Sequence, residues 1–135
     1  MKTRGPNAAI ELHDSELSHP ERDGMTCTLV LNAYVHCSQG TPGVHPGSGW
    51  SQPATIRITQ ARFDGDAPVL PLRLLGGRLT GPGVELHNLI PVPSLVSGPV
   101  RLELVGANEQ ALAVVGDAAE VALCGEARYV EEFPG

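Results

Sequence analysis

The amino-acid sequence predicts an all-β fold, an antiparallel β-sandwich or an incomplete β-barrel of about eight short strands with little or no helix. Apolar and polar residues alternate along most of the chain, as in half-buried strands. Glycine and proline, 16 and 12 of the 135 residues, separate these segments as turn residues do. No long stretch keeps the helical period of about 3.6 residues. We expect residues 1–135 to form one domain, since the length suits a single core.

The first half of the chain carries the clearest strand signals. Strands are expected at residues 8–13, 26–37 and 54–59, where apolar side chains alternate with polar ones. Within 26–37 every odd position holds a small or apolar residue, so the odd face of this strand is expected in the core. After Gln60 the apolar residues change parity, which predicts a β-bulge or a bend.

The second half repeats the pattern in shorter pieces. Gly76-Gly77 and Gly116-Asp117 are interpreted as turns, and Pro91 and Pro93 exclude their segment from a central strand. The tail at 128–133 carries Tyr129, Val130 and Phe133, so we expect it to dock on the body or on a second subunit. Strands are expected at 69–75, 84–90, 100–104, 111–115 and 119–124.

Charge and composition exclude several classes of function. Nine Lys and Arg residues stand against 15 Asp and Glu residues, a net charge of −6, and the basic residues are scattered singly. This balance disfavours binding to nucleic acid or to an anionic membrane. No apolar run approaches the roughly 18 residues of a membrane span. The polar start of the chain lacks the apolar region of a signal peptide, so the cytoplasm is the expected compartment.

The three cysteines are expected to be reduced core residues. Cys27 and Cys37 lie ten residues apart in one predicted strand, which places them roughly 33 Å apart at about 3.3 Å per residue. They therefore cannot form a disulfide with each other. Cys124 lies in another strand-like segment, and no CxxC spacing indicates a zinc site.

Ser38–Pro53 interrupts the alternation and is expected to be a long loop. It contains four glycines, three prolines, His45 and the only tryptophan, Trp50. Long loops without regular structure are usually functional or disordered, and the indole favours an ordered one. Two interpretations stay open, a structural lid plugged by Trp50 and a binding loop.

Four of the five histidines fall in the first third of the chain, and we consider whether they form a site. His13 and His36 lie on the polar faces of their predicted strands and meet if those strands pair in register. With Asp14 nearby, imidazole and carboxylate groups are suitable metal ligands. No HxH or HExxH spacing supports a metal site, however, and hydrogen-bonded surface histidines explain the cluster as well.

No catalytic motif is recognised. The sequence has no GxSxG, and its glycine-rich pieces precede no GK[ST] and open no helix. Cys37 is next to His36, but neighbouring residues of a strand point to opposite faces, so the histidine does not serve as its base. Glu131 and Glu132 are adjacent, so on a strand they diverge rather than form an acid–base pair.

Several segments together resemble an uncharacterised bacterial all-β family of unknown function. They are Ile10–Ser15, Ala33–His36, Pro42–Trp50, Asn88–Pro91 and Gly125–Glu131. The likeness spans nearly the whole chain and implies no known chemistry. Within the first segment, Leu-His-Asp-Ser is also similar to the opening of small β-rich immunity-type domains, and this second likeness implies binding to a toxin protein.

Two hypotheses of function follow. The preferred one is a non-catalytic binding or interaction domain without a cofactor, which contacts a protein or a small ligand, with a homodimer through a strand edge as an option. The alternative is a metal-dependent enzyme or metal-binding protein that uses His13, His36 and His45. The candidate ligand-binding residues are His13, Asp14, Tyr34, His36, His45 and Trp50.

Overall fold

The computed structural model describes residues 4–134, and within them it contains strands and no helix. The all-β prediction is therefore confirmed, with ten strands in the described part instead of about eight. The strands are β1 (Asn7–Asp23), β2 (Thr26–Ser38), β3 (Gly47–Thr59), β4 (Arg62–Phe63), β5 (Leu72–Gly81), β6 (Val84–His87), β7 (Leu89–Val92), β8 (Ser94–Gly106), β9 (Ala111–Leu123) and β10 (Arg128–Phe133).

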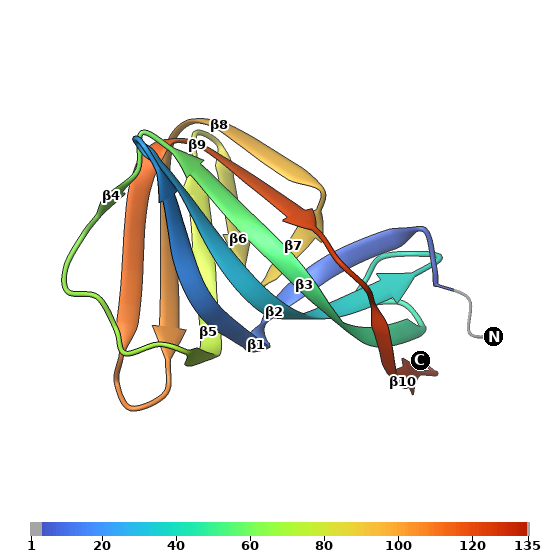
Figure 1. Ribbon diagram of the computed structural model, residues 1–135. Helices are drawn as coiled ribbons and strands as arrows, with labels where there is room; N and C mark the ends of the chain where they lie inside the picture. Colours follow the sequence, from blue (N-terminus) through green and yellow to red (C-terminus); the bar gives the residue numbers. More distant parts are fainter. Residues whose placement is uncertain (1–3, 135) are drawn as a thin grey trace.

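Six of the strands close a barrel. Antiparallel pairing follows the cycle β1-β2-β3-β9-β8-β5 and returns to β1 (Figure 1). The four shorter strands each pair with part of one barrel strand: β4 with β9, β6 with β5, β7 with β1 and β10 with β3. The architecture is thus a closed barrel with additions, whereas the sequence predicted a sandwich or an incomplete barrel. Closure removes the open edges from these six strands.

The alternation along β2 and β3 builds the core as predicted. Every odd residue of β2 from Cys27 to Cys37 is at most 2% exposed. Ala54, Ile56 and Ile58 of β3 are fully buried beside them. Because successive side chains of a strand point to opposite faces, this single parity fixes which face of each strand lines the barrel.

A bulge in β1 divides the molecule into two parts. The register with β2 changes between Glu11 and Glu16, and Asp14 adopts a φ of 75°. The Ser15 hydroxyl donates to the Glu11 carbonyl oxygen at 2.6 Å and accepts from the Tyr34 amide at 2.9 Å. This side chain therefore completes the hydrogen bonding that the displaced backbone leaves open.

The residues of β1 that precede the bulge pair with β7, whereas those that follow it pair with β5. The first half of β1, the ends of β2 and β3, and the short strands β7 and β10 form a five-stranded sheet that projects from the barrel (Figure 1). We call this sheet the extension, and its strands comprise residues 7–11, 34–38, 47–51, 89–92 and 128–133. The apolar tail docks here, as the sequence predicted, by pairing with β3.

Half of the predicted loop at Ser38–Pro53 is strand. β2 continues to Ser38 and β3 begins at Gly47, so only residues 39–46 connect them. Trp50 is part of β3 and 8% exposed, so it is no plug on a lid. The alternation is hidden because two outward positions are glycine. A Cβ at Gly47 would lie 2.0 Å from the Cys37 carbonyl oxygen, and one at Gly49 would lie 2.2 Å from the Tyr34 hydroxyl oxygen.

Two glycine-containing dipeptides predicted as turns lie inside strands. Gly76 and Gly77 belong to β5, and Gly116 with Asp117 belongs to β9, which runs unbroken from Ala111 to Leu123. A Cβ on Gly77 would lie 2.7 Å from a backbone oxygen of β8, and one on Gly116 would lie 2.4 Å from a backbone oxygen after Ile58. These glycines permit close approach of neighbouring strands, which sequence alone does not distinguish from a turn.

Two smaller predictions need correction. The strand expected at 69–75 starts at Leu72, and the one expected at 84–90 is divided at Asn88, whose φ is 58°. Cys27 and Cys37 are buried and free, as expected, but Cys124 is exposed, because it follows the last residue of β9. Pro91 lies in β7, which pairs only with β1, and Pro93 lies between β7 and β8, consistent with exclusion from a central position.

Candidate functional site

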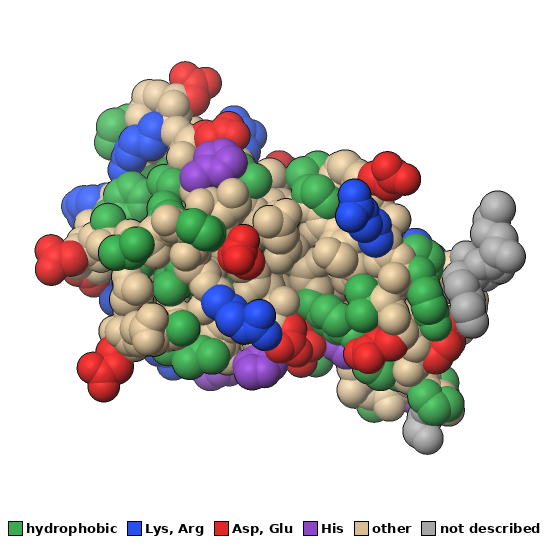
Figure 2. Space-filling model, turned by 60° about the horizontal axis from the view of Figure 1, so that its bottom comes forward, with side chains coloured by type: hydrophobic (Ala, Val, Ile, Leu, Met, Phe, Trp, Pro, Cys, Tyr) green, Lys and Arg blue, Asp and Glu red, His purple; other side chains and the backbone are tan. Residues whose placement is uncertain are grey.

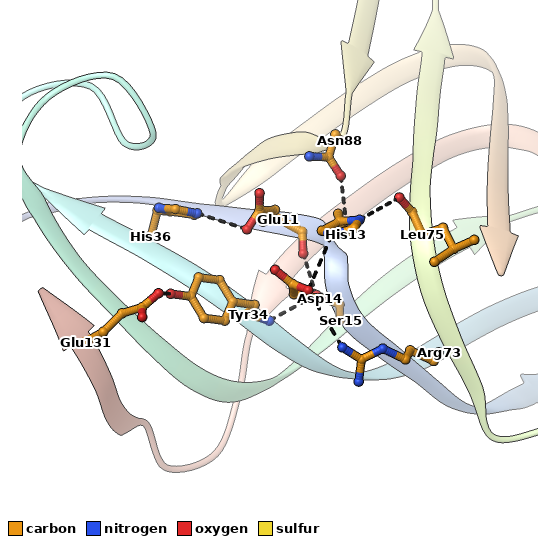
Figure 3. A network of polar contacts seen from close by, with 10 residues as sticks. All are labelled: Glu11, His13, Asp14, Ser15, Tyr34, His36, Arg73, Leu75, Asn88 and Glu131. Atoms are coloured by element: carbon orange, nitrogen blue, oxygen red, sulfur yellow. Dashed lines mark hydrogen bonds and ion pairs between the residues drawn. The ribbon is translucent and has the colours of Figure 1, made fainter. Parts of the chain in front are cut away.

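The outer face of the extension carries three of the six predicted site residues, Tyr34, His36 and His45. Tyr34 and His36 project from the same face of β2, because they stand two residues apart. The Tyr34 hydroxyl donates to Glu131 Oε1 at 2.5 Å, and His36 Nε2 lies 3.1 Å from Glu11 Oε2 (Figure 3). The His36 ring is stacked on Phe133, with 4.7 Å between ring centroids. Polar and aromatic contacts thus fasten β10 across β2 and β3.

Glycine at position 49 makes this arrangement possible. Gly49 pairs with both His36 and Glu131, so it lies between β2 and β10. A Cβ there would be 2.8 Å from Tyr34 Cζ and 3.3 Å from the Phe133 ring. The tyrosine ring therefore crosses the bare backbone of β3 to reach the carboxylate of β10.

A hollow of about 330 Å³ opens beside His36. The connection at 39–46 forms one wall and the end of β10 forms another. Val44 stands there 73% exposed, an apolar side chain presented to solvent. We call this feature the outer hollow, and it is lined by His36, Cys37, Gly43, Val44, His45, Gly47, Phe133 and Pro134.

The connection at 39–46 is held in one conformation by hydrogen bonds. The Thr41 carbonyl oxygen accepts from the amides of Val44 and His45, at 3.0 and 2.9 Å. The Ser38 hydroxyl donates to the Pro46 carbonyl oxygen at 2.8 Å. Asn7 of β1 donates its side-chain amide to the Gly40 carbonyl oxygen at 2.7 Å. The wall of the outer hollow is thus tied to two strands of the extension.

The hydrogen bonds also fix which ring nitrogens of the two histidines carry protons. The Thr41 amide donates to His45 Nδ1 at 2.7 Å, so neutral His45 carries its proton on Nε2. His36 Nε2 faces the Glu11 carboxylate, which only accepts, so this nitrogen is protonated too. Among the described residues, His36 Nδ1 is buried and has no hydrogen-bond partner. His45, a lining residue of the outer hollow, therefore keeps one ring N–H that the Thr41 hydrogen bond does not use.

His13 and Asp14 lie at the bulge and outside the lining of the outer hollow. His13 Nδ1 is 2.9 Å from the Leu75 carbonyl oxygen, and its Nε2 is 3.4 Å from Asp14 Oδ1 (Figure 3). Asp14 is also 3.8 Å from Arg73 of β5. These contacts join the bulge to the neighbouring strand β5. Asn88, between β6 and β7, accepts from the His13 amide through its Oδ1 at 2.7 Å.

Trp50 faces the opposite side of the extension. Its indole N–H donates to Ser48 Oγ at 2.8 Å, and Tyr129 meets it edge to face. The Arg4 guanidinium lies 4.9 Å above the indole and donates to Cys37 Sγ at 3.1 and 3.3 Å and to the Gln52 side-chain oxygen at 3.0 Å. Trp50 therefore belongs to the inner packing of the extension.

The predicted metal-ligand set His13, His36 and His45 is not brought together. Two of these histidines line the outer hollow and the third lies at the bulge. Within residues 4–134, no group of three or more His, Cys, Asp or Glu side chains is placed where it could hold a metal ion. His19, the fourth histidine of the cluster, lies 3.5 Å from Glu21 further along β1.

Electrostatics keep the Tyr34 hydroxyl protonated. Burial raises the pKa of Tyr34 well above the ordinary value of 10.0, and the hydrogen bond to Glu131 and the nearby negative charges of Glu131, Glu11 and Asp14 raise it further. The tyrosine is consequently a hydrogen-bond donor to the carboxylate throughout the neutral pH range.

Sequence reasoning missed four residues of this region: Arg4, Glu11, Glu131 and Phe133. Phe133 had a signal, because an apolar tail was expected to dock, but the docking place depends on strand pairing. Glu11 and Tyr34 are paired residues on adjacent strands, which only the register reveals. Arg4 precedes β1 in a polar stretch that indicated nothing about structure.

Comparison of the chain with protein-family models, curated proteins and solved structures finds no match. Among the described residues, no helix has the length and apolar character needed to cross a membrane. The face shown in Figure 2 carries acidic and basic side chains scattered among uncharged ones, without a broad basic patch.

Proposed function

We propose that this chain is a non-catalytic binding domain that contacts a protein partner through the outer face of the extension. The observation that carries the proposal is the outer hollow, with exposed Val44 at its wall, Phe133 and Pro134 opposite, and the N–H of His45 as a donor. Partners commonly anchor a few apolar side chains in such hollows, with polar contacts around them. The local resemblance to immunity-type domains also favours a protein as the partner.

The arrangement of Cys37 and His36 supports a non-catalytic role. Cysteine can act as a nucleophile and histidine as its base, and both residues line the outer hollow. Their side chains, however, point to opposite faces of β2. Cys37 Sγ accepts from Arg4 on the inner side, while His36 Nε2 is directed to Glu11. Nucleophilic catalysis needs hydrogen-bond contact between the two groups, which this geometry does not provide.

The charge of the chain favours a basic partner. The net charge is −6, and the extension carries Glu11, Glu131 and Glu132. Opposite charge accelerates association, so a partner surface with lysine or arginine around an apolar anchor fits this face. We propose that binding takes place in the cytoplasm, which the unpaired state of the three cysteines supports.

Capture from a source-cell lysate by variant proteins tests the proposal. Val44→Glu places a charge at the outer hollow, and Val69→Glu is its matched control, since both valines are 73% exposed and Val69 is not part of the lining. We expect one protein to be retained by wild type and by Val69→Glu, and to be lost or weakened at least about tenfold by Val44→Glu. Equal retention by all three proteins, or retention by none, would contradict the proposal.

A further inference from the structure

A second cavity lies at the barrel, away from the residues of the outer hollow. Its volume is about 150 Å³. Leu17 of β1 and Leu112 of β9 form its buried floor, both at most 5% exposed. Phe63 of β4 and the segment after it, with Ala67, Pro68 and Leu70, form the other walls. We call this feature the end cavity; in Figure 1 its strand β4 lies at the opposite side of the molecule from β10.

The segment that covers the end cavity is tied down from both ends. The Asp64 amide donates to the Ala113 carbonyl oxygen at 2.9 Å, and the Asp64 carboxylate accepts from Arg101 at 2.7 Å. Further along, the Val69 amide donates to the Gln110 side-chain oxygen at 2.6 Å. Residues 65–68 lie between these anchors and form one side of the cavity, which opens to solvent beside the exposed residues Pro20 and Ala67.

The lining of the end cavity is apolar throughout. All its side chains are leucine, proline, phenylalanine or alanine, and no part of its surface is polar. A water molecule held in a cavity needs about two to four polar partners, which this lining does not supply. A polar ligand would lose its hydration without a compensating hydrogen bond, which disfavours its binding. The lining therefore selects against water and polar molecules.

We propose that the end cavity binds a small, neutral, apolar molecule about the size of one benzene ring. Size and chemistry agree, because an enclosed apolar cavity of about 150 Å³ lined by leucine, isoleucine and phenylalanine takes up benzene or xenon, and the end cavity has a similar volume with leucine and phenylalanine in its lining. Phe63 offers a ring edge or face to an aromatic guest, and the leucines offer methyl groups. This site is independent of the binding surface proposed for the extension.

Titration of the full chain with benzene, followed through leucine methyl resonances, tests this inference. We expect saturable shifts at the methyl groups of Leu17, Leu70 and Leu112, with little change at leucines outside the lining. Ala67→Leu fills the cavity from an exposed position and is expected to weaken benzene binding by at least about tenfold, since it occupies the apolar space that the ligand uses. Ala111→Leu, also exposed and outside the lining, is expected to change it by less than about twofold.

Two results would overturn the inference. One is a set of shifts that never saturates or that spreads over leucines on all sides of the barrel. The other is benzene affinity that is the same in Ala67→Leu as in wild type. Val44→Glu, at the outer hollow, is expected to leave benzene binding unchanged, which separates this site from the partner surface.

Discussion

Replacing Ser15 with alanine tests whether one hydroxyl holds the extension to the barrel. Ser15 is 1% exposed and lies in the bulge of β1. Its hydroxyl donates to the Glu11 carbonyl oxygen and accepts from the Tyr34 amide, so Ser15→Ala removes two hydrogen bonds and adds no bulk. Both backbone groups then lose their hydrogen bond to this hydroxyl at a place where neighbouring strands limit access by water.

The expected loss follows from these two groups. An unsatisfied buried donor or acceptor costs about 1–3 kcal/mol. Glu11 and Tyr34 are partly exposed residues, so the lower half of the range applies and the sum is about 2–4 kcal/mol. That is a large share of the roughly 5–15 kcal/mol that stabilises a typical domain.

Urea unfolding of Ser15→Ala, followed through the single tryptophan, measures this free energy. Because Trp50 lies in the extension, its fluorescence reports on this part of the molecule. Ser18→Ala is the matched control in the same strand, where the hydroxyl meets only an exposed imidazole, and its expected effect is within about 0.5 kcal/mol. If Ser15→Ala also stays within that margin and the Tyr34 amide keeps its protection from hydrogen exchange, the assigned role is wrong.

The other predictions concern the same region and the cysteines. Gly49→Ala is expected to destabilise the fold by about 1–3 kcal/mol through its clash with Tyr34, whereas Gly76→Ala, with open space around it, changes the urea midpoint little. Tyr34 has a raised pKa in the folded state, so its contribution is complete below pH 10 and is lost as pH rises above the unfolded value; alkaline unfolding of Tyr34→Phe should show a smaller loss than wild type, and equal losses would refute this. Cys124 should react with a thiol reagent in the native protein, while the other two cysteines react only after unfolding, which counting of labelled thiols checks.

Side-chain parity made part of this structure predictable. Along β2 the odd residues enter the core without exception from Cys27 to Cys37, because a strand has a strict period of two. The docking of the tail was also predictable, since Tyr129 and Phe133 are too apolar to remain in solvent. Both inferences concern one segment at a time, and neither needs knowledge of which strands are neighbours.

Features that depend on two strands at once were not predictable. The sequence predicted turns at Gly77 and Gly116. In the structure these glycines allow close contact with a neighbouring backbone, and in a sequence such a glycine cannot be distinguished from one in a turn. Closure of the barrel depends on the pairing of β1 with β5, which comprises only residues 16 and 17 on one side. Of the predicted site residues, His36 and His45 line the outer hollow, and their neighbour Phe133 comes from the far end of the chain.

The continuity of β2 and β3 has a consequence for the thermodynamics of association. Each runs for 13 residues from the barrel into the extension, without the loop that a hinge would require. The proposed binding face is therefore pre-organised, and a partner bound there would lose no affinity to the ordering of a flexible module. Conformational entropy would be lost mainly by side chains such as Val44, and structures with and without a partner should superimpose closely in the strands.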